Sequence, residues 1–77
     1  MKIRVLAFAQ ARERLGFAER MVDCSEEDTP RAILLTVAPD YCPDPSIRVA
    51  VNRAYADWDK PVGAAFELAV IPMVSGG

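Results

Sequence analysis

The sequence contains no histidine and only two cysteines, Cys24 and Cys42, which form no CxxC pair. Histidine is the commonest general base and a common ligand of transition metals, so its absence argues against a catalytic triad or a metal site. The two cysteines could form one disulfide, but two reduced thiols are the default in a chain without a secretion signal. Any chemistry must therefore depend on a group outside the usual side-chain constellations.

The sequence also lacks a basic excess and a long hydrophobic run. Its net charge is -2, and its nine lysines and arginines are scattered from Lys2 to Lys60, so no positive field exists to concentrate nucleic acid. No apolar stretch approaches the roughly 18 residues of a membrane span, and the charged start Met1–Val5 is unlike a signal peptide. We expect a cytoplasmic protein that binds neither nucleic acid nor membranes.

Glycine is scarce as well, with 4 glycines among 77 residues, yet two of the four are the last residues, Gly76 and Gly77. Residues without a Cβ atom adopt conformations closed to others, and they can pass through a narrow tunnel that presents the terminal carboxylate as a reactive group. By composition alone, an ordinary frayed terminus explains the pair equally well.

The residues that are present predict a small folded domain with several strands. A content of 52% hydrophobic and 26% charged residues is typical of one compact domain, here residues 1–77 with a tail over 73–77. Apolar and alternating patterns predict strands over 2–8, 18–24, 47–52 and 66–71, and a weaker one over 55–59. Three prolines make 39–46 a loop, and turns are expected at Asn52–Arg53 and 60–63.

Two helices are predicted between these strands. Residues 9–15 are rich in helix formers and stop at Gly16. The main helix begins with Thr29 as N-cap and ends before Pro39, and its apolar face consists of Pro30, Ile33, Leu34 and Val37. One amphipathic helix on a mixed sheet, with the apolar first and last strands parallel at the centre, is the α+β fold called β-grasp, or ubiquitin-like.

Three segments resemble one protein family. Residues 8–16 resemble the Phe-Ala-x-x-Arg-Glu-x-x-Gly pattern of the molybdopterin synthase small subunit, the MoaD family of sulfur carriers. Residues 49–52 resemble its penultimate strand, and residues 72–77 are similar to its Pro-Pro-Val-(Ser/Ala)-Gly-Gly ending. Two departures are visible, because Met73 replaces the second proline and Ala64-Ala65 stand where the family usually has a Gly-Asp turn before Glu-Leu.

The resemblance implies a chemistry for the tail. An activating enzyme uses ATP to adenylate Gly77, and sulfur then replaces one oxygen to give a thiocarboxylate, with Gly76 as the flexible neighbour. The thiocarboxylate enters the large synthase subunit and donates sulfur to a cyclic pyranopterin phosphate, which forms the molybdopterin dithiolene. The resemblance further implies no bound cofactor and a heterotetramer built from a pair of each subunit. The residues expected to contact partners are Ser75, Val74, Met73, Pro72, Phe8, Leu68 and Arg12.

Several alternatives stay open at this point. Phe8, Leu68 and Val70 form a docking patch or pack in the core, and core packing is the better explanation for at least two of them. Arg12 contacts a partner or belongs to a solvated helix face, and Trp58 is a half-buried edge residue or an interface residue. The alternative functions are a sulfur carrier of the thiamin type, a ubiquitin-like modifier joined to lysines, and a plain β-grasp interaction module.

Overall fold

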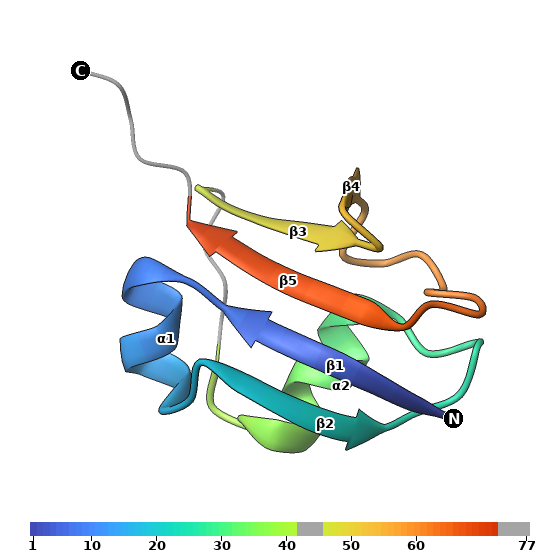
Figure 1. Cartoon of the computed structure of the whole chain (residues 1–77), viewed down its shortest axis with the longest axis horizontal. Coiled ribbons are helices and arrows are strands. Elements are labelled where there is room, and N and C mark those ends of the chain that lie inside the picture. The colour runs from blue at the N-terminus through green and yellow to red at the C-terminus, as the bar shows by residue number, and fades with distance from the viewer. Residues whose placement is uncertain (42–45, 73–77) are drawn as a thin grey trace.

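The structure is a computed structural model that describes residues 1–41 and 46–72, and it contains a five-stranded mixed sheet (Figure 1). The strands follow the order β2-β1-β5-β3-β4 across the sheet. In chain order the elements are β1 (Lys2–Ala7), α1 (Ala9–Leu15), β2 (Glu19–Asp23), α2 (Pro30–Val37), β3 (Ile47–Val51), β4 (Ala54–Ala56) and β5 (Glu67–Pro72). This is the β-grasp architecture that the pattern of elements predicts.

The first and last strands pair in parallel at the centre of the sheet. Their register runs from Arg4 opposite Glu67 to Ala7 opposite Val70, whereas β1 with β2, β5 with β3, and β3 with β4 are antiparallel. A parallel pair needs a long crossover, and the chain between β1 and β5 supplies it with every other element of the fold. The predicted central position of these two strands is confirmed.

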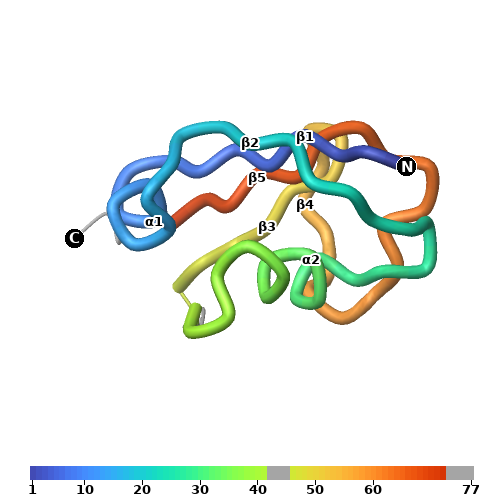
Figure 2. The backbone as a smooth tube through the Cα atoms, turned by 90° about the horizontal axis from the view of Figure 1, so that it is seen from below, coloured from blue at the N-terminus to red at the C-terminus, as the bar shows by residue number. Residues whose placement is uncertain are grey.

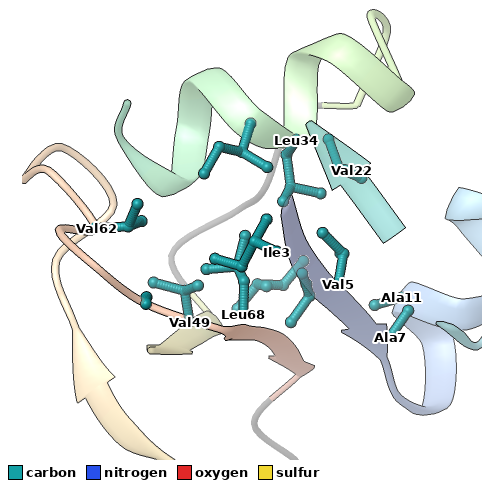
Figure 3. Close-up of a cluster of buried hydrophobic side chains, with 13 residues drawn as sticks. Ile3, Val5, Ala7, Ala11, Val22, Leu34, Val49, Val62 and Leu68 are labelled. Carbon is teal, nitrogen blue, oxygen red and sulfur yellow. The ribbon is translucent and has the colours of Figure 1, made fainter. Parts of the chain in front are cut away.

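A single hydrophobic core lies between this sheet and α2. Ile3 and Val5 of β1, Leu68 of β5, and Ile33 and Leu34 of α2 are almost fully buried. Figure 3 shows the β1 and β5 side chains pointing toward Leu34, with Val22 and Val49 on either side. Burying one such side chain is worth about 1.5–3 kcal/mol, so these contacts supply much of the stability of so short a chain.

The main helix begins and ends where the sequence predicts. The Thr29 hydroxyl accepts a hydrogen bond from the Ala32 N–H at 3.1 Å, and Pro30 fills the first helical position, where no N–H is needed. The backbone leaves the helical region at Ala38, just before Pro39. Its buried residues Pro30, Ile33 and Leu34 face the sheet, and Figure 2 shows the helix lying across one side of it.

The short elements differ slightly from their predicted bounds. The first strand stops at Ala7 because Phe8 becomes the residue that precedes α1. Helix α1 ends at Leu15, and Gly16 caps it with a φ of 83°, which suits glycine. The weak strand predicted over 55–59 is the three-residue β4, which begins earlier because the hairpin turn is tight. The proline-rich loop predicted over 39–46 lies partly outside the described residues.

Asn52 connects the β3–β4 turn to the start of β5. Asn52 and Arg53 both have positive φ, 51° and 69°, as a two-residue hairpin turn of type I′ requires. The Asn52 Oδ1 atom accepts hydrogen bonds from the N–H groups of Phe66 at 3.0 Å and Glu67 at 3.1 Å. The Asn52 N–H donates to the Glu67 carbonyl at 2.9 Å. In the turn that precedes β5, Gly63 has a positive φ of 68°, so Ala64 and Ala65 do not need a positive φ.

The segment after β4 is anchored by Trp58, which is half-buried at the edge of the sheet, as expected. Its ring N–H donates to the Ile47 carbonyl at 3.2 Å, and its own carbonyl accepts from the Arg31 N–H at 3.1 Å. The Arg31 guanidinium makes two hydrogen bonds to the Asp59 carboxylate, at 2.8 and 3.3 Å, and lies 5.8 Å from the Trp58 ring centre. These contacts join the segment to both α2 and β3.

We predict that Asn52→Ala lowers the free energy of unfolding by about 1–3 kcal/mol, because two backbone donors lose their acceptor and alanine tolerates the positive φ poorly. Urea unfolding measures the loss. Asn52→Gly keeps the backbone conformation, so its smaller loss reports the hydrogen bonds alone. Unchanged unfolding of Asn52→Ala would show that this turn does not stabilise β5.

A second prediction concerns pH. The hydrogen bond from Arg31 lowers the pKa of Asp59 below its ordinary value. As pH falls, Asp59 therefore takes up its proton in the unfolded chain before it does so in the folded chain. The stabilisation that the Arg31–Asp59 pair gives the fold is present above about pH 4 and is lost as pH falls through the lowered pKa of Asp59. Trp58 fluorescence should show an acid transition below that pH. Asp59→Asn should remove this transition and Asp23→Asn should keep it; the same transition in both variants would contradict the assignment.

Candidate functional site

The predicted reactive residues follow directly on the central strand of the sheet. Gly77, Gly76, Ser75, Val74 and Met73 lie outside the described residues. Pro72 is the last residue of β5; it is half-buried and lies opposite Ile47 of β3. Because β5 lies between β1 and β3, the chain continues beyond Pro72 from the middle of one end of the sheet. The surface around this end is the candidate site.

Phe8 lies beside this end of β5, as a docking residue should. Its N–H donates to the Val70 carbonyl at 3.3 Å, which connects the end of β1 to β5 two residues before Pro72. Phe8 is 48% exposed, so a large part of its ring is open to contact. The structure therefore brings Phe8 and Pro72 to the same end of the sheet.

Helix α1 forms the second part of this surface, because it packs against the ends of β1 and β5 (Figure 1). Ala11 is its buried residue, which leaves Arg12 and Glu13 exposed. Within residues 1–41 and 46–72, Arg12 forms no ion pair. The arginine can therefore meet a carboxylate on a partner, although the same exposure fits a solvated helix face.

The expectation that Leu68 contacts a partner is wrong for this fold. Leu68 and Val70 are both 0% exposed. Successive residues of a strand point to opposite faces, so these two, which are two positions apart in β5, share the face toward α2. Core packing therefore explains both, and Phe8 is the member of the proposed patch that lies on the surface. The apolar run of the last strand hid this alternation in the sequence.

The opposite face of the sheet carries apolar residues that sequence reasoning missed. The register aligns Leu6, Ala69, Ala50 and Tyr55 in one row across four strands, on the side away from α2. Met21, on the same face of β2, is 53% exposed, and Tyr55 is 68% exposed. We call this row with Met21 and Ile71 the open face. Strand alternation, counted outward from the buried Leu68, could have found it.

The other chemically reactive groups have structural explanations. Burial raises the pKa of the half-buried Cys24 thiol, which disfavours the nucleophilic thiolate, and Cys42 lies outside the described residues. Glu67 is nearly buried at the start of β5 and lies 3.9 Å from the Arg53 guanidinium. In the described part of the chain, no group of acidic or cysteine side chains could hold a metal ion, and no helix could span a membrane.

A five-stranded sheet in the order β2-β1-β5-β3-β4 with one helix across it defines the ubiquitin-like β-grasp class. The sequence matches the ThiS family over residues 5–77, which is nearly the whole chain. The chain belongs to the ThiS family and is thus a ubiquitin-like sulfur carrier or modifier.

Solved structures agree with this class. SAMP1 from Haloferax volcanii is 26% identical with a TM-score of 0.77, and the match covers 100% of both chains. A candidate molybdopterin converting factor subunit 1 from Pyrococcus furiosus is 23% identical with a TM-score of 0.73, and the match covers 96% of this chain and 99% of that one. The small archaeal modifier protein 1 of Methanosarcina acetivorans is 20% identical with a TM-score of 0.69, over 99% and 96%.

We predict unequal losses of stability for alanine substitutions at two residues, Leu68 and Phe8. Leu68→Ala should lower the free energy of unfolding by about 2–5 kcal/mol because it leaves a cavity in the core. Phe8→Ala should cost below about 1 kcal/mol, since its ring is half exposed. Urea denaturation compares the two; equal losses would mean that Phe8 is a core residue and not a docking residue.

Proposed function

We infer that this protein is the sulfur-carrier small subunit of a molybdopterin synthase, with Gly77 as the residue that carries sulfur. The observation that supports this most is the match to the ThiS family, which extends through the final Gly76-Gly77. The motif over residues 8–16 resembles that of the molybdopterin branch, and this supports the proposal together with two contacts: Phe8 hydrogen-bonds to Val70 of β5, and α1, which carries Arg12, packs against β5.

The proposed reaction needs activation because a carboxylate is a poor electrophile. The Gly77 carboxylate attacks the α-phosphate of ATP on an activating enzyme, which releases pyrophosphate and leaves an acyl adenylate. A sulfur nucleophile then displaces AMP, and one oxygen of the carboxyl group is replaced by sulfur. The thiocarboxylate sulfur then forms a bond to a carbon of a cyclic pyranopterin phosphate bound by the large subunit, and water cleaves the bond between that sulfur and the Gly77 acyl carbon, which regenerates the carboxylate. Gly76 and Gly77 have no side chains to crowd either step.

The role of the folded domain is to dock and to hold the start of the tail. In this proposal Phe8, Arg12 and Pro72 contact the partner around the end of β5, and residues 73–75 enter it. The open face, in particular Ile71 next to Pro72, extends the contact surface. The partners supply the binding pockets and the orientation on which the rate depends. We propose the same surface for the activating enzyme and for the large subunit, in a cytoplasmic heterotetramer with a pair of each.

A second candidate function is protein modification, in which the activated Gly77 is joined to a lysine of another protein. The observation that favours it is the full-length match to SAMP1 from Haloferax volcanii, because SAMP1 is a small archaeal modifier protein. Activation by adenylation is common to both candidates. A sulfur carrier of the thiamin type shares the same chemistry and differs in the large partner.

We predict that the chain, co-expressed with its activating enzyme, gains the mass of one sulfur in place of one oxygen. Deletion of Gly77 should abolish this gain without changing the urea unfolding curve, because the residue lies beyond the last strand. Cys24→Ser and Cys42→Ser should still load, which separates a thiocarboxylate from a persulfide. Normal loading of the truncated chain would rule out Gly77 as the carrier.

The same samples discriminate between the functions. Co-purification with a molybdopterin synthase large subunit supports the first candidate, and adducts linked through lysine support the modifier. A chain whose mass never changes would contradict both and would leave a plain interaction module.

A further inference from the structure

The sheet ends at β4, an edge strand of three residues. Ala54, Tyr55 and Ala56 are all exposed, and among the described residues no strand lies on the outer side of β4 (Figure 1). Proteins usually protect such an edge with proline, lysine or a bulge, because backbone groups along it can pair with another chain. β4 contains neither proline nor lysine, and its register with β3 runs without a bulge. The strand therefore carries none of these protections.

The side of β4 that faces α2 leaves room for a second strand. Ala54 and Ala56 lie opposite Val51 and Val49, so their side chains are on the α2 side of the sheet. Both alanines are exposed, and both line a pocket of about 1000 Å³ beside β4. Because alanine side chains are short, a strand that approaches this edge meets no bulky group from β4 on that side.

The residues at alternate positions of this edge form a self-complementary pattern. Arg53, Tyr55 and Asp57 give the order positive, aromatic, negative. When two copies of the edge run antiparallel about a two-fold axis at Tyr55, Arg53 of each copy lies opposite Asp57 of the other. In the same register Ala54 lies opposite Ala56, and Tyr55 lies opposite its own copy. Opposite charges directly across a strand pair stabilise it, as do paired aromatic rings.

Both charges are placed for such a pairing. The Arg53 side chain is 84% exposed, and its guanidinium lies 3.9 Å from the Glu67 carboxylate, which is a long and weak contact. Asp57 is also exposed, and its Oδ1 atom accepts a hydrogen bond from the Asp59 N–H at 2.8 Å. This bond orients the Asp57 carboxylate and leaves its Oδ2 atom for an arginine of the other copy.

The other edge of the sheet, β2, has the opposite character. A two-fold pairing of β2 with its own copy about the central Met21 sets Glu19 of each copy opposite Asp23 of the other. Like charges directly across a strand pair destabilise it. The charge pattern therefore favours self-pairing at β4 and disfavours it at β2.

We propose that two copies of this chain associate through β4, antiparallel about a two-fold axis at Tyr55. The two sheets then continue into one another, with an Arg53–Asp57 pair at each end of the contact. β4 lies on the other side of β5 from α1, so this contact does not use the surface around Phe8. The inference does not rest on the proposed function.

Sedimentation equilibrium of the full chain measures this association. A contact between two strands of three residues belongs to the weak class of interfaces, so the average mass should rise from that of one chain toward that of two over about 0.01–1 mM. The association should weaken as salt is added, because both ion pairs lie at the surface. A native chain that stays a single copy at about 1 mM would overturn the proposal.

A charge exchange locates the contact. Arg53→Glu places a glutamate opposite Asp57 of the other copy, and Asp57→Lys places a lysine opposite Arg53, so each variant alone should associate at least about tenfold more weakly than the native chain. Mixed in equal amounts, the two variants restore both pairs of opposite charge. The mixture should therefore associate as the native chain does.

The matched control is Arg14→Glu, which makes the same charge change on α1 and should associate as the native chain does. Circular dichroism verifies that each variant folds, and the comparison of Arg53→Glu with Arg14→Glu decides the question even without the mixture. Equal weakening in both of these variants would reveal an effect of net charge alone and overturn the proposal. So would unchanged association of Arg53→Glu, which would place the interface elsewhere, or a mixture of folded variants that fails to associate. None of these measurements involves Gly77, so the proposed function is tested separately.

Discussion

The parallel pairing of β1 with β5 is the constraint on which the rest of the structure depends. It places β1 and β5 at the centre of the sheet, where each has a paired strand along both of its edges, and it requires every other element to lie in the crossover between them. Because the two strands run the same way, their ends meet at one edge together with Phe8 and α1. The fold thereby surrounds the start of the tail with a surface that a partner can recognise.

In the proposed function, this arrangement divides the work between the domain and its partners. The described residues contain a core, an anchored hairpin and exposed apolar and basic groups, but no cluster suited to acid–base or metal chemistry. Asn52 and Trp58 have structural roles, since each uses more than one hydrogen bond to hold a loop against the sheet. Asn52 fixes the start of β5, and Trp58 bonds to Ile47, which lies opposite Pro72 at the end where the tail begins. In the proposed function this rigid domain supports a reactive group that works in a pocket provided by another protein.

Much of the fold was predictable because local signals agreed with it. The Thr29 cap, the stop at Gly16 and the turn at Asn52 each have a local physical cause, and each lies where the sequence predicts. The docking surface was harder, because β5 is apolar on both faces and its run does not show which side faces α2. From the sequence, Leu68 could therefore be a docking residue or a core residue. The structure buries Leu68, and it puts Ile71, which is half-buried, and Ala69, which is 6% exposed, on the face away from α2. The pocket beside β4 is lined by segments that are distant in the sequence, which no local pattern indicates.

The central claim is that the carboxyl group of Gly77 is the reactive group of this protein. Fragmentation of the intact protein in a mass spectrometer, after isolation with its activating enzyme, tests the claim most directly because it locates the sulfur in the sequence. We predict that the sulfur-for-oxygen replacement appears in C-terminal fragments that contain Gly77 and in no fragment that lacks it. The account would be contradicted if the added sulfur were found on fragments that contain Cys24 or Cys42 while the C-terminal fragments with Gly77 were unmodified.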